Sequence, residues 1–139
     1  MQESIKLTPS TDWACAEEMV RVDPDRSFVD AKCNAAEREL LMIELNGKKS
    51  GFVLLGYWNE EDGKAVEVSK FLVLPPHRGK DGISLDSARA VFSLLDRRNY
   101  KSYSLHSLNS KASHFWRKAL LGMKYREDGS LFRVGEWDY

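Results

Sequence analysis

The N-terminal part of the chain combines one alternating segment with apolar residues at helical spacing. Residues 4–8 alternate between apolar and polar side chains and predict a short strand. Thr11 or Asp12 can cap a helix whose apolar residues share one face until Pro24 ends it. A second, shorter helix is predicted over 28–35, where apolar residues lie three and four positions apart.

From Leu40 the period of the apolar positions changes to two, which is typical of strands. The alternation runs up to Asn46-Gly47, a dipeptide that tolerates positive φ and suits a tight hairpin turn. The return strand is predicted over 51–58, and a further extended, largely apolar segment follows over 66–74. The pattern therefore predicts three consecutive antiparallel strands.

The second half of the chain returns to helical spacing and then alternates again. Apolar residues over 85–95 predict the clearest amphipathic helix, and 100–108 is typical of a strand. Asn109 or Ser110 can cap a further helix, and Gly122 is placed to end it. The chain therefore continues with a helix, a strand and a helix.

A last hairpin is predicted between 123–126 and 131–137, with its turn at Asp128-Gly129. The predicted element order is β α α β β β α β α β β. Such an order is typical of an α+β or mixed α/β domain in which helices cover a largely antiparallel sheet. The strand over 131–137 also offers an edge through which two copies could pair as a homodimer.

Composition narrows the class of protein. With 139 residues, 42% hydrophobic and 30% charged, the chain is expected to form a single globular domain over 1–139. The formal net charge of zero argues against specific nucleic-acid binding. Cys15 and Cys33 are too few for a disulfide framework, and no metal-ligand spacing occurs. No leader-like or membrane-spanning apolar stretch is found, so a cytoplasmic location is expected.

The segment that joins the strand 66–74 to the long helix has the chemistry of an anion site. Gly79 and Gly82 let backbone N–H groups approach a phosphate, and the helix N-terminus adds partial positive charge. Arg78 and Lys80 add full charges. A pyrophosphate would be held well there. The alternative is a strand-to-helix turn that uses its glycines for conformation alone.

Two motifs here resemble the GCN5-related N-acetyltransferase (GNAT) superfamily. The first consists of Val73-Leu-Pro75, Arg78-Gly79-Lys80 and Gly82-Ile83-Ser84. The second consists of Asn109, Ala112, Phe115-Trp116 and Gly122-Met123. The resemblance covers nearly the whole chain and implies about six to seven strands, splayed at a cofactor slot and flanked by about four helices.

The resemblance implies acetyl-CoA as co-substrate and a primary amine, on a small molecule or a protein, as acceptor. The pantetheine arm would lie between 66–74 and 100–108, with a backbone N–H near Leu72 or Val73 directed at the thioester carbonyl. The cofactor-binding residues implied are Leu72, Val73, Arg78, Gly79, Lys80, Asp81, Gly82, Ile83, Ser84, Asn109, Phe115 and Trp116.

Two departures from the family pattern point to an alternative, a degenerate member that binds CoA or a protein partner without turnover. Asp81 is an extra residue beside the expected phosphate site, and Trp116 stands where many members have the Tyr that reprotonates the thiolate. Tyr125 is the catalytic acid we prefer, with Tyr103 and His114 as alternatives.

Glu67 is the candidate general base, because an amine must lose a proton before it attacks a thioester. The alternative for Glu67 is a solvent-facing position on a one-sided sheet. The resemblance implies an acceptor side rimmed by Asp23, Asp25, Arg26 and the acidic stretch 60–62, and an acidic rim favours cationic amines. Transfer to a charged tRNA would need a basic face, and the balanced charge counts against it.

Overall fold

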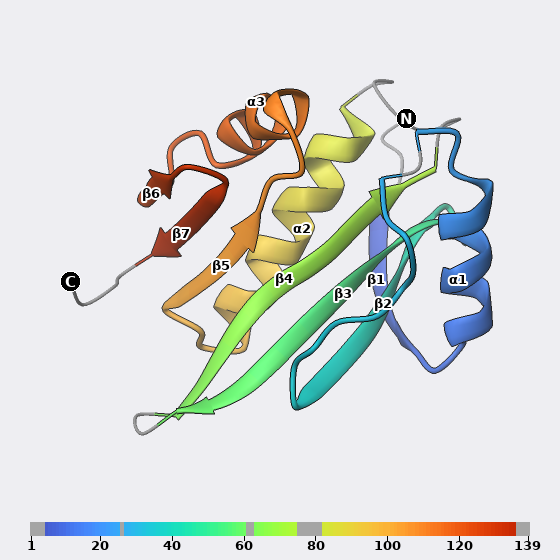
Figure 1. Cartoon of the computed structure of the whole chain (residues 1–139), viewed down its shortest axis with the longest axis horizontal. Coiled ribbons are helices and arrows are strands. Elements are labelled where there is room, and N and C mark those ends of the chain that lie inside the picture. The colour runs from blue at the N-terminus through green and yellow to red at the C-terminus, as the bar shows by residue number, and fades with distance from the viewer. Residues whose placement is uncertain (1–4, 26, 61–62, 75–81, 136–139) are drawn as a thin grey trace.

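Seven strands form one sheet in the order β1-β2-β3-β4-β5-β7-β6 (Figure 1). The computed structural model describes residues 5–25, 27–60, 63–74 and 82–135. Neighbouring strands are antiparallel except β4 and β5, which are parallel. The elements are β1 (Ile5–Ser10), α1 (Trp13–Val22), β2 (Glu37–Leu45), β3 (Lys48–Glu60), β4 (Gly63–Val73), α2 (Ile83–Arg97), β5 (Ser102–His106), α3 (Ser110–Ala119), β6 (Tyr125–Asp128) and β7 (Leu131–Gly135).

Helices cover both faces of the sheet, which we call the α1 face and the α2 face; α3 lies beside α2 on the latter (Figure 1). Successive residues of β2 and β3 alternate between two apolar cores, so both strands read as continuous apolar runs. Sheet residues of the α1-face core are Leu40, Met42, Phe52, Leu54 and Leu72. Sheet residues of the α2-face core include Leu41, Ile43, Val53, Leu55, Val66, Val68, Val73, Tyr103, Leu105, Phe132 and Val134.

The predicted fold class and several of the predicted ends of elements are confirmed. The Asp12 carboxylate caps α1 by accepting from the Cys15 N–H at 3.0 Å, and the Asn109 side chain caps α3 by accepting from the Ala112 N–H at 2.8 Å. Asn46, at φ 52°, lies in the β2–β3 turn. Local capping and turn chemistry thus determine these positions.

The helix predicted over 28–35 is wrong, so the described residues contain three helices. Side-chain oxygens there take the amide donors that a helix would pair with carbonyls. The Ala31 N–H donates to Glu17 Oε1 at 3.0 Å, and the Lys32 N–H donates to Asp30 Oδ1 at 3.1 Å. The segment 27–36 is therefore an irregular connection lying on the α1 face.

The C-terminal hairpin differs from the prediction in its turn and its place in the sheet. Asp128 pairs with Leu131, so the turn is Gly129-Ser130, one residue later than expected. β7 lies between β5 and β6, because it pairs with both. Residues 131–135 thus have sheet neighbours on both sides, and the expected homodimer contact through this strand is not available to them.

A β-bulge in β4 changes which way its side chains face. Leu54 pairs with Lys70 and Leu55 pairs with Val68, so Ser69 is an extra residue in the ladder. In a regular strand, Lys70 would share the α2 face with Val68. The bulge instead turns Lys70 to the α1 face and the following Phe71 to the α2 face, where each has its contacts.

Candidate active site

The parallel strands β4 and β5 stay together over a short distance only. Among the described residues their ladder consists of Glu67 with Ser104 and Val68 with Leu105. β4 then continues past the bulge at Ser69 along β3, whereas the chain after β5 turns away, because the Ser107 N–H donates to the Ser130 carbonyl at 2.8 Å. We call the region beyond these two pairs the β4–β5 gap. The predicted splay of strands lies here.

Glu67 lies at the edge of the β4–β5 gap, on the α1 face. It is directly opposite Gly56 of β3 and beside Ser104 of β5. Its side chain is half-buried, and burial raises the pKa of the carboxyl above its ordinary value, while the positive charge of His106 opposes this shift. The carboxylate is therefore neither a freely solvated surface group nor a partner in an ion pair with a described residue.

The N-terminus of α2 offers donors that suit an anion. Gly82, the N-cap residue, has φ 70° and ψ 15°, and no described side chain caps the helix. The N–H groups of the first turn, including those of Ile83 and Ser84, have no intrahelical acceptors. Such donors together with the helix dipole suit a phosphate. The predicted Arg78, Gly79, Lys80 and Asp81 lie outside the described residues.

Aromatic side chains line the α2-face side of the gap. Phe71 of β4 stacks on Phe115 of α3 with ring centroids 5.9 Å apart, and its ring lies 5.4 Å from that of Trp116. Trp116 also contacts Phe92 of α2 at 6.2 Å, and Phe92 stacks on Tyr103 of β5 at 5.7 Å. Trp116 is only 7% exposed. Its indole therefore belongs to the hydrophobic core, while the half-buried rings of Phe71 and Phe115 form an apolar wall on the α2-face side of the gap.

The backbone of β4 beyond the bulge also bears on the site. The Leu72 side chain enters the α1-face core and that of Val73 enters the α2-face core. The Leu74 N–H donates to the Ser50 carbonyl at 2.8 Å, toward β3. Since N–H directions alternate along a strand, the Val73 N–H is directed to the other side of β4, where the gap lies.

Tyr125 is not brought together with Glu67. It lies on β6, with β7 and β5 between it and β4, and it stacks on Phe132 at 6.0 Å on the α2 face. Glu67 is on the α1 face. Tyr103 borders the gap but is buried, and burial raises the pKa of its hydroxyl. Neither tyrosine is therefore near the Glu67 carboxylate.

Two other predicted residues have structural surroundings of their own. The buried Asp23 carboxylate accepts from the Asp25 N–H and the Ser27 N–H, both at 3.1 Å, so it closes the turn after α1 and is not an exposed acidic rim. Asn109, besides capping α3, lines a cavity of about 450 Å³ with the exposed His114 beside the β6–β7 turn.

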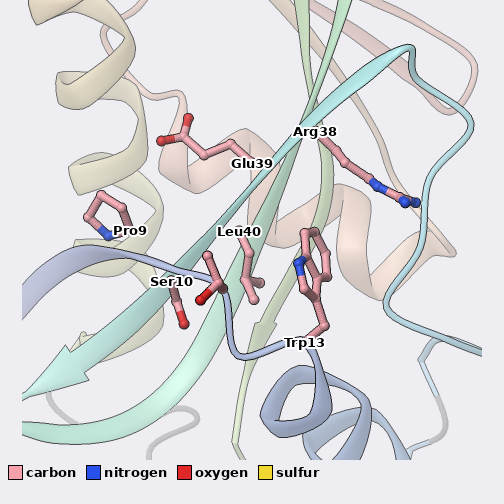
Figure 2. Close-up of a pocket in the computed structure, with 7 residues that line it drawn as sticks. Pro9, Ser10, Trp13, Arg38, Glu39 and Leu40 are labelled. Carbon is pink, nitrogen blue, oxygen red and sulfur yellow. The ribbon is translucent and has the colours of Figure 1, made fainter.

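A cavity of about 400 Å³ lies at the opposite end of the sheet order, at the β1–α1 turn. Figure 2 shows Arg38 beside the Trp13 ring, with the guanidinium carbon 5.5 Å from the ring centroid, while Glu39 points to the other side of β2. β3 separates β2 from β4 in the sheet, so this cavity does not belong to the β4–β5 gap.

Lys70 and the place of His106 beside Glu67 were not predicted. The sequence does carry a signal for the first, since two successive polar residues, Ser69-Lys70, interrupt the alternation of Val66, Val68, Phe71 and Val73. Among the described residues, no group of three or more His, Cys, Asp or Glu side chains could hold a metal ion, and no described helix is long and apolar enough to span a membrane.

Comparisons with known proteins agree with this architecture. No family model and no curated protein matches the sequence. Among solved structures, an acetyltransferase from Thermus thermophilus is 16% identical, with a TM-score of 0.69, covering 96% of this chain and 97% of that one. Arabidopsis thaliana Naa50 in complex with a bisubstrate analogue is 18% identical, with a TM-score of 0.65, covering 98% and 99%.

A third similar structure is a GNAT family acetyltransferase from Elizabethkingia anophelis with acetyl-CoA bound. It is 15% identical, with a TM-score of 0.63, and the match covers 97% of this chain and 100% of that one. These matches extend over nearly the full length of both chains. The chain therefore has the fold of the GCN5-related N-acetyltransferase superfamily, as its two sequence motifs predicted.

Proposed function

We propose that this protein is an N-acetyltransferase that moves the acetyl group of acetyl-CoA to a primary amine by direct attack in a ternary complex. The observation that carries the proposal is the place of Glu67. A half-buried carboxylate with a raised pKa stands where β4 and β5 part, in a fold shared with acetyltransferases. A carboxylate in such surroundings is suited to general base catalysis.

The chemistry needs three things from the chain. The acceptor amine must lose a proton, and Glu67 takes it directly or through one water, with the amine approaching from the α1 face. The carbonyl oxygen gains charge during attack, and we propose a backbone N–H of β4 near Leu72 or Val73 as its donor. The described aromatic wall of Phe71 and Phe115 keeps water from the α2-face side.

The residues present fit an acyl-CoA. Acetyl-CoA supplies the activated thioester, and the chain holds its diphosphate. The first-turn amides after Gly82, which no described side chain caps, supply donors for that group, and we propose that Arg78 to Ser84 form the complete cradle. Leu72 and Val73 border the arm, with Asn109, Phe115 and Trp116 on the α3 side. Asp81 is the residue that most opposes this assignment, because it adds negative charge beside the diphosphate.

A binder without turnover is the second candidate, and the packing of Trp116 favours it. The residue where the family often places a reprotonating Tyr is here a buried indole, which cannot donate that proton near neutral pH. Tyr125 lies across the sheet from Glu67. If the protein is an enzyme, water therefore protonates the leaving thiolate.

Thermal unfolding with acetyl-CoA, followed by a thiol-release assay, tests the proposal. Ligand at about 100 times its dissociation constant should stabilise the protein by about 2.7 kcal/mol if it binds the native state alone. Spermidine, lysine and glucosamine form a panel that spans cationic and sugar amines. Stabilisation with free thiol released in step with acetylated amine supports the enzyme. Stabilisation without release supports the binder, and no stabilisation at millimolar acetyl-CoA rejects both.

A further inference from the structure

The segment 27–36 crosses the α1 face next to Glu67 and is tied down there. Ala35 sits on Gly56, the residue directly opposite Glu67; a Cβ at position 56 would lie only 2.9 Å from that of Ala35. In the middle of the segment, the buried Ala31 donates its N–H to Glu17 of α1 at 3.0 Å. The segment therefore forms the wall of the face from which we propose the acceptor amine arrives.

Lys70 ties the middle of this segment to β4. Its ammonium donates to the Asp30 carbonyl at 2.6 Å and to Asp30 Oδ1 at 2.8 Å, and it lies 5.4 Å from the centroid of the Phe28 ring. The lysine side chain is 16% exposed and that of Asp30 is 42% exposed, so these contacts are only partly shielded from water. One cation thus fixes a main-chain carbonyl, a carboxylate and an aromatic ring of the same segment.

Lys70 lies next to the bulge at which the β4–β5 ladder ends. It comes directly after Ser69, and because Ser69 is accommodated as a bulge and not as a regular strand position, Lys70 lies on the α1 face, where it contacts Asp30. It lies three residues from Glu67 on the same face. Any displacement of the segment 27–36 at Asp30 would therefore change the wall beside the general base, without touching the aromatic wall or the N-terminus of α2.

We propose that Lys70 is a positioning residue for the acceptor, holding the segment 27–36 over the Glu67 face so that the amine binds in line with the thioester. This inference rests on the proposed function. Lys70 touches neither reactant; its contribution is to fix a wall of the site before the amine arrives, which lowers the entropic cost of binding. Loss of the contacts between Lys70 and Asp30 should weaken acceptor binding and leave acetyl-CoA binding unchanged.

The test compares Lys70→Met, which keeps an unbranched side chain and removes the charge, with Lys70→Arg. The matched control is Lys49→Met, which removes a lysine from an exposed ion pair with Asp12 at 3.4 Å elsewhere on the sheet. With the best amine of the panel, Lys70→Met should raise KM for the amine about tenfold, the scale of one charge-assisted hydrogen-bond network, and change KM for acetyl-CoA less than about twofold. Lys70→Arg should restore most of the wild-type affinity for the amine, and the Lys49→Met control should have wild-type KM values for both substrates.

Hydrogen–deuterium exchange over 27–36 supplies a readout that does not need activity, and faster exchange is expected in Lys70→Met. Unchanged exchange, or an unchanged amine KM in a folded Lys70→Met protein, overturns the proposal. Equal increases in both KM values indicate general loosening and also overturn it. A wild-type protein that binds acetyl-CoA but acetylates no amine rejects the proposed function first and the acceptor role with it, even if exchange increases.

Discussion

Replacing Glu67 by Gln is the most direct perturbation of the candidate site. The amide has nearly the same shape, so the strand pairing with Gly56 and Ser104 is retained, while the acceptor for the amine proton is lost. General base catalysis contributes about 10²- to 10⁴-fold. Because the carboxylate is half-buried and water can partly replace it, we expect the low end, about 100-fold or 2.7 kcal/mol at neutral pH.

The pH dependence should distinguish a base from a structural carboxylate. Burial raises the pKa of Glu67, so the wild-type rate should increase as pH rises through that value, where the carboxyl loses its proton. In Glu67→Gln this acid limb should disappear, and the deficit should narrow at high pH, where the amine deprotonates unaided. His106→Gln removes the charge that opposes the shift, so it should move the acid limb to higher pH.

The assay is thiol release at saturating acetyl-CoA from about pH 5 to about pH 9, with acetyl-CoA binding measured separately. Glu44→Gln on β2 is the matched control, since it removes a partly exposed strand glutamate away from the gap. If Glu67→Gln kept the wild-type rate and pH profile while binding acetyl-CoA normally, Glu67 would not be the base.

Three further predictions concern the cofactor site and stability. Gly82→Val should abolish the acetyl-CoA-induced Tm shift, because valine disfavours φ 70° and crowds the first-turn amides. The control Gly122→Val, with similar strain at φ 86°, should retain the shift. A normal shift in Gly82→Val would refute the phosphate site. Glu39 accepts hydrogen bonds from Arg98, which lower its pKa below 4.5, so its stabilisation is present above that pH and is lost as pH falls through the folded value. Glu39→Gln should thus cost about 0.5 to 1 kcal/mol in urea unfolding at neutral pH and little in acid, because the pair is partly exposed to water; a pH-independent difference would contradict this. Ser87→Ala should stabilise by about 1 kcal/mol, because the fully buried hydroxyl has no hydrogen-bond partner within the described structure; a loss of stability would show that it has one.

Local chemistry made most of the fold predictable. The cap residues Asp12 and Asn109 and the Asn46-Gly47 turn act through neighbours in the sequence, so their side chains and backbone preferences fix the ends of elements without reference to the rest of the chain. The helix wrongly predicted over 28–35 shows the opposite case, in which tertiary contacts override the local pattern. Its apolar spacing is real, but the Ala31 amide donates to Glu17 of α1 and the Lys32 amide to the Asp30 side chain.

The candidate site was predictable at Glu67 and at Gly82, where one residue type has a distinct chemical use. The site was not predictable where strand order or strand register determines the position of a residue. Tyr125 has the right chemistry, but the insertion of β7 beside β5 leaves two strands, β5 and β7, between it and β4, and no local pattern encodes that order. Lys70 was missed because a bulge, which the sequence indicates only by two adjacent polar residues, determines its face.

The bulge at Ser69 also separates the bend of β4 from the packing of its side chains. A bulge absorbs one residue, so the strand without Ser69 would still alternate in the order that puts Lys70 and Phe71 on their present faces. What it would lose is the irregularity in β4 at the point where its ladder with β5 ends. The opening therefore depends on how many residues β4 contains more than on which residue stands at 69. Substitutions at position 69 should therefore be tolerated, whereas an insertion or deletion in β4 should not.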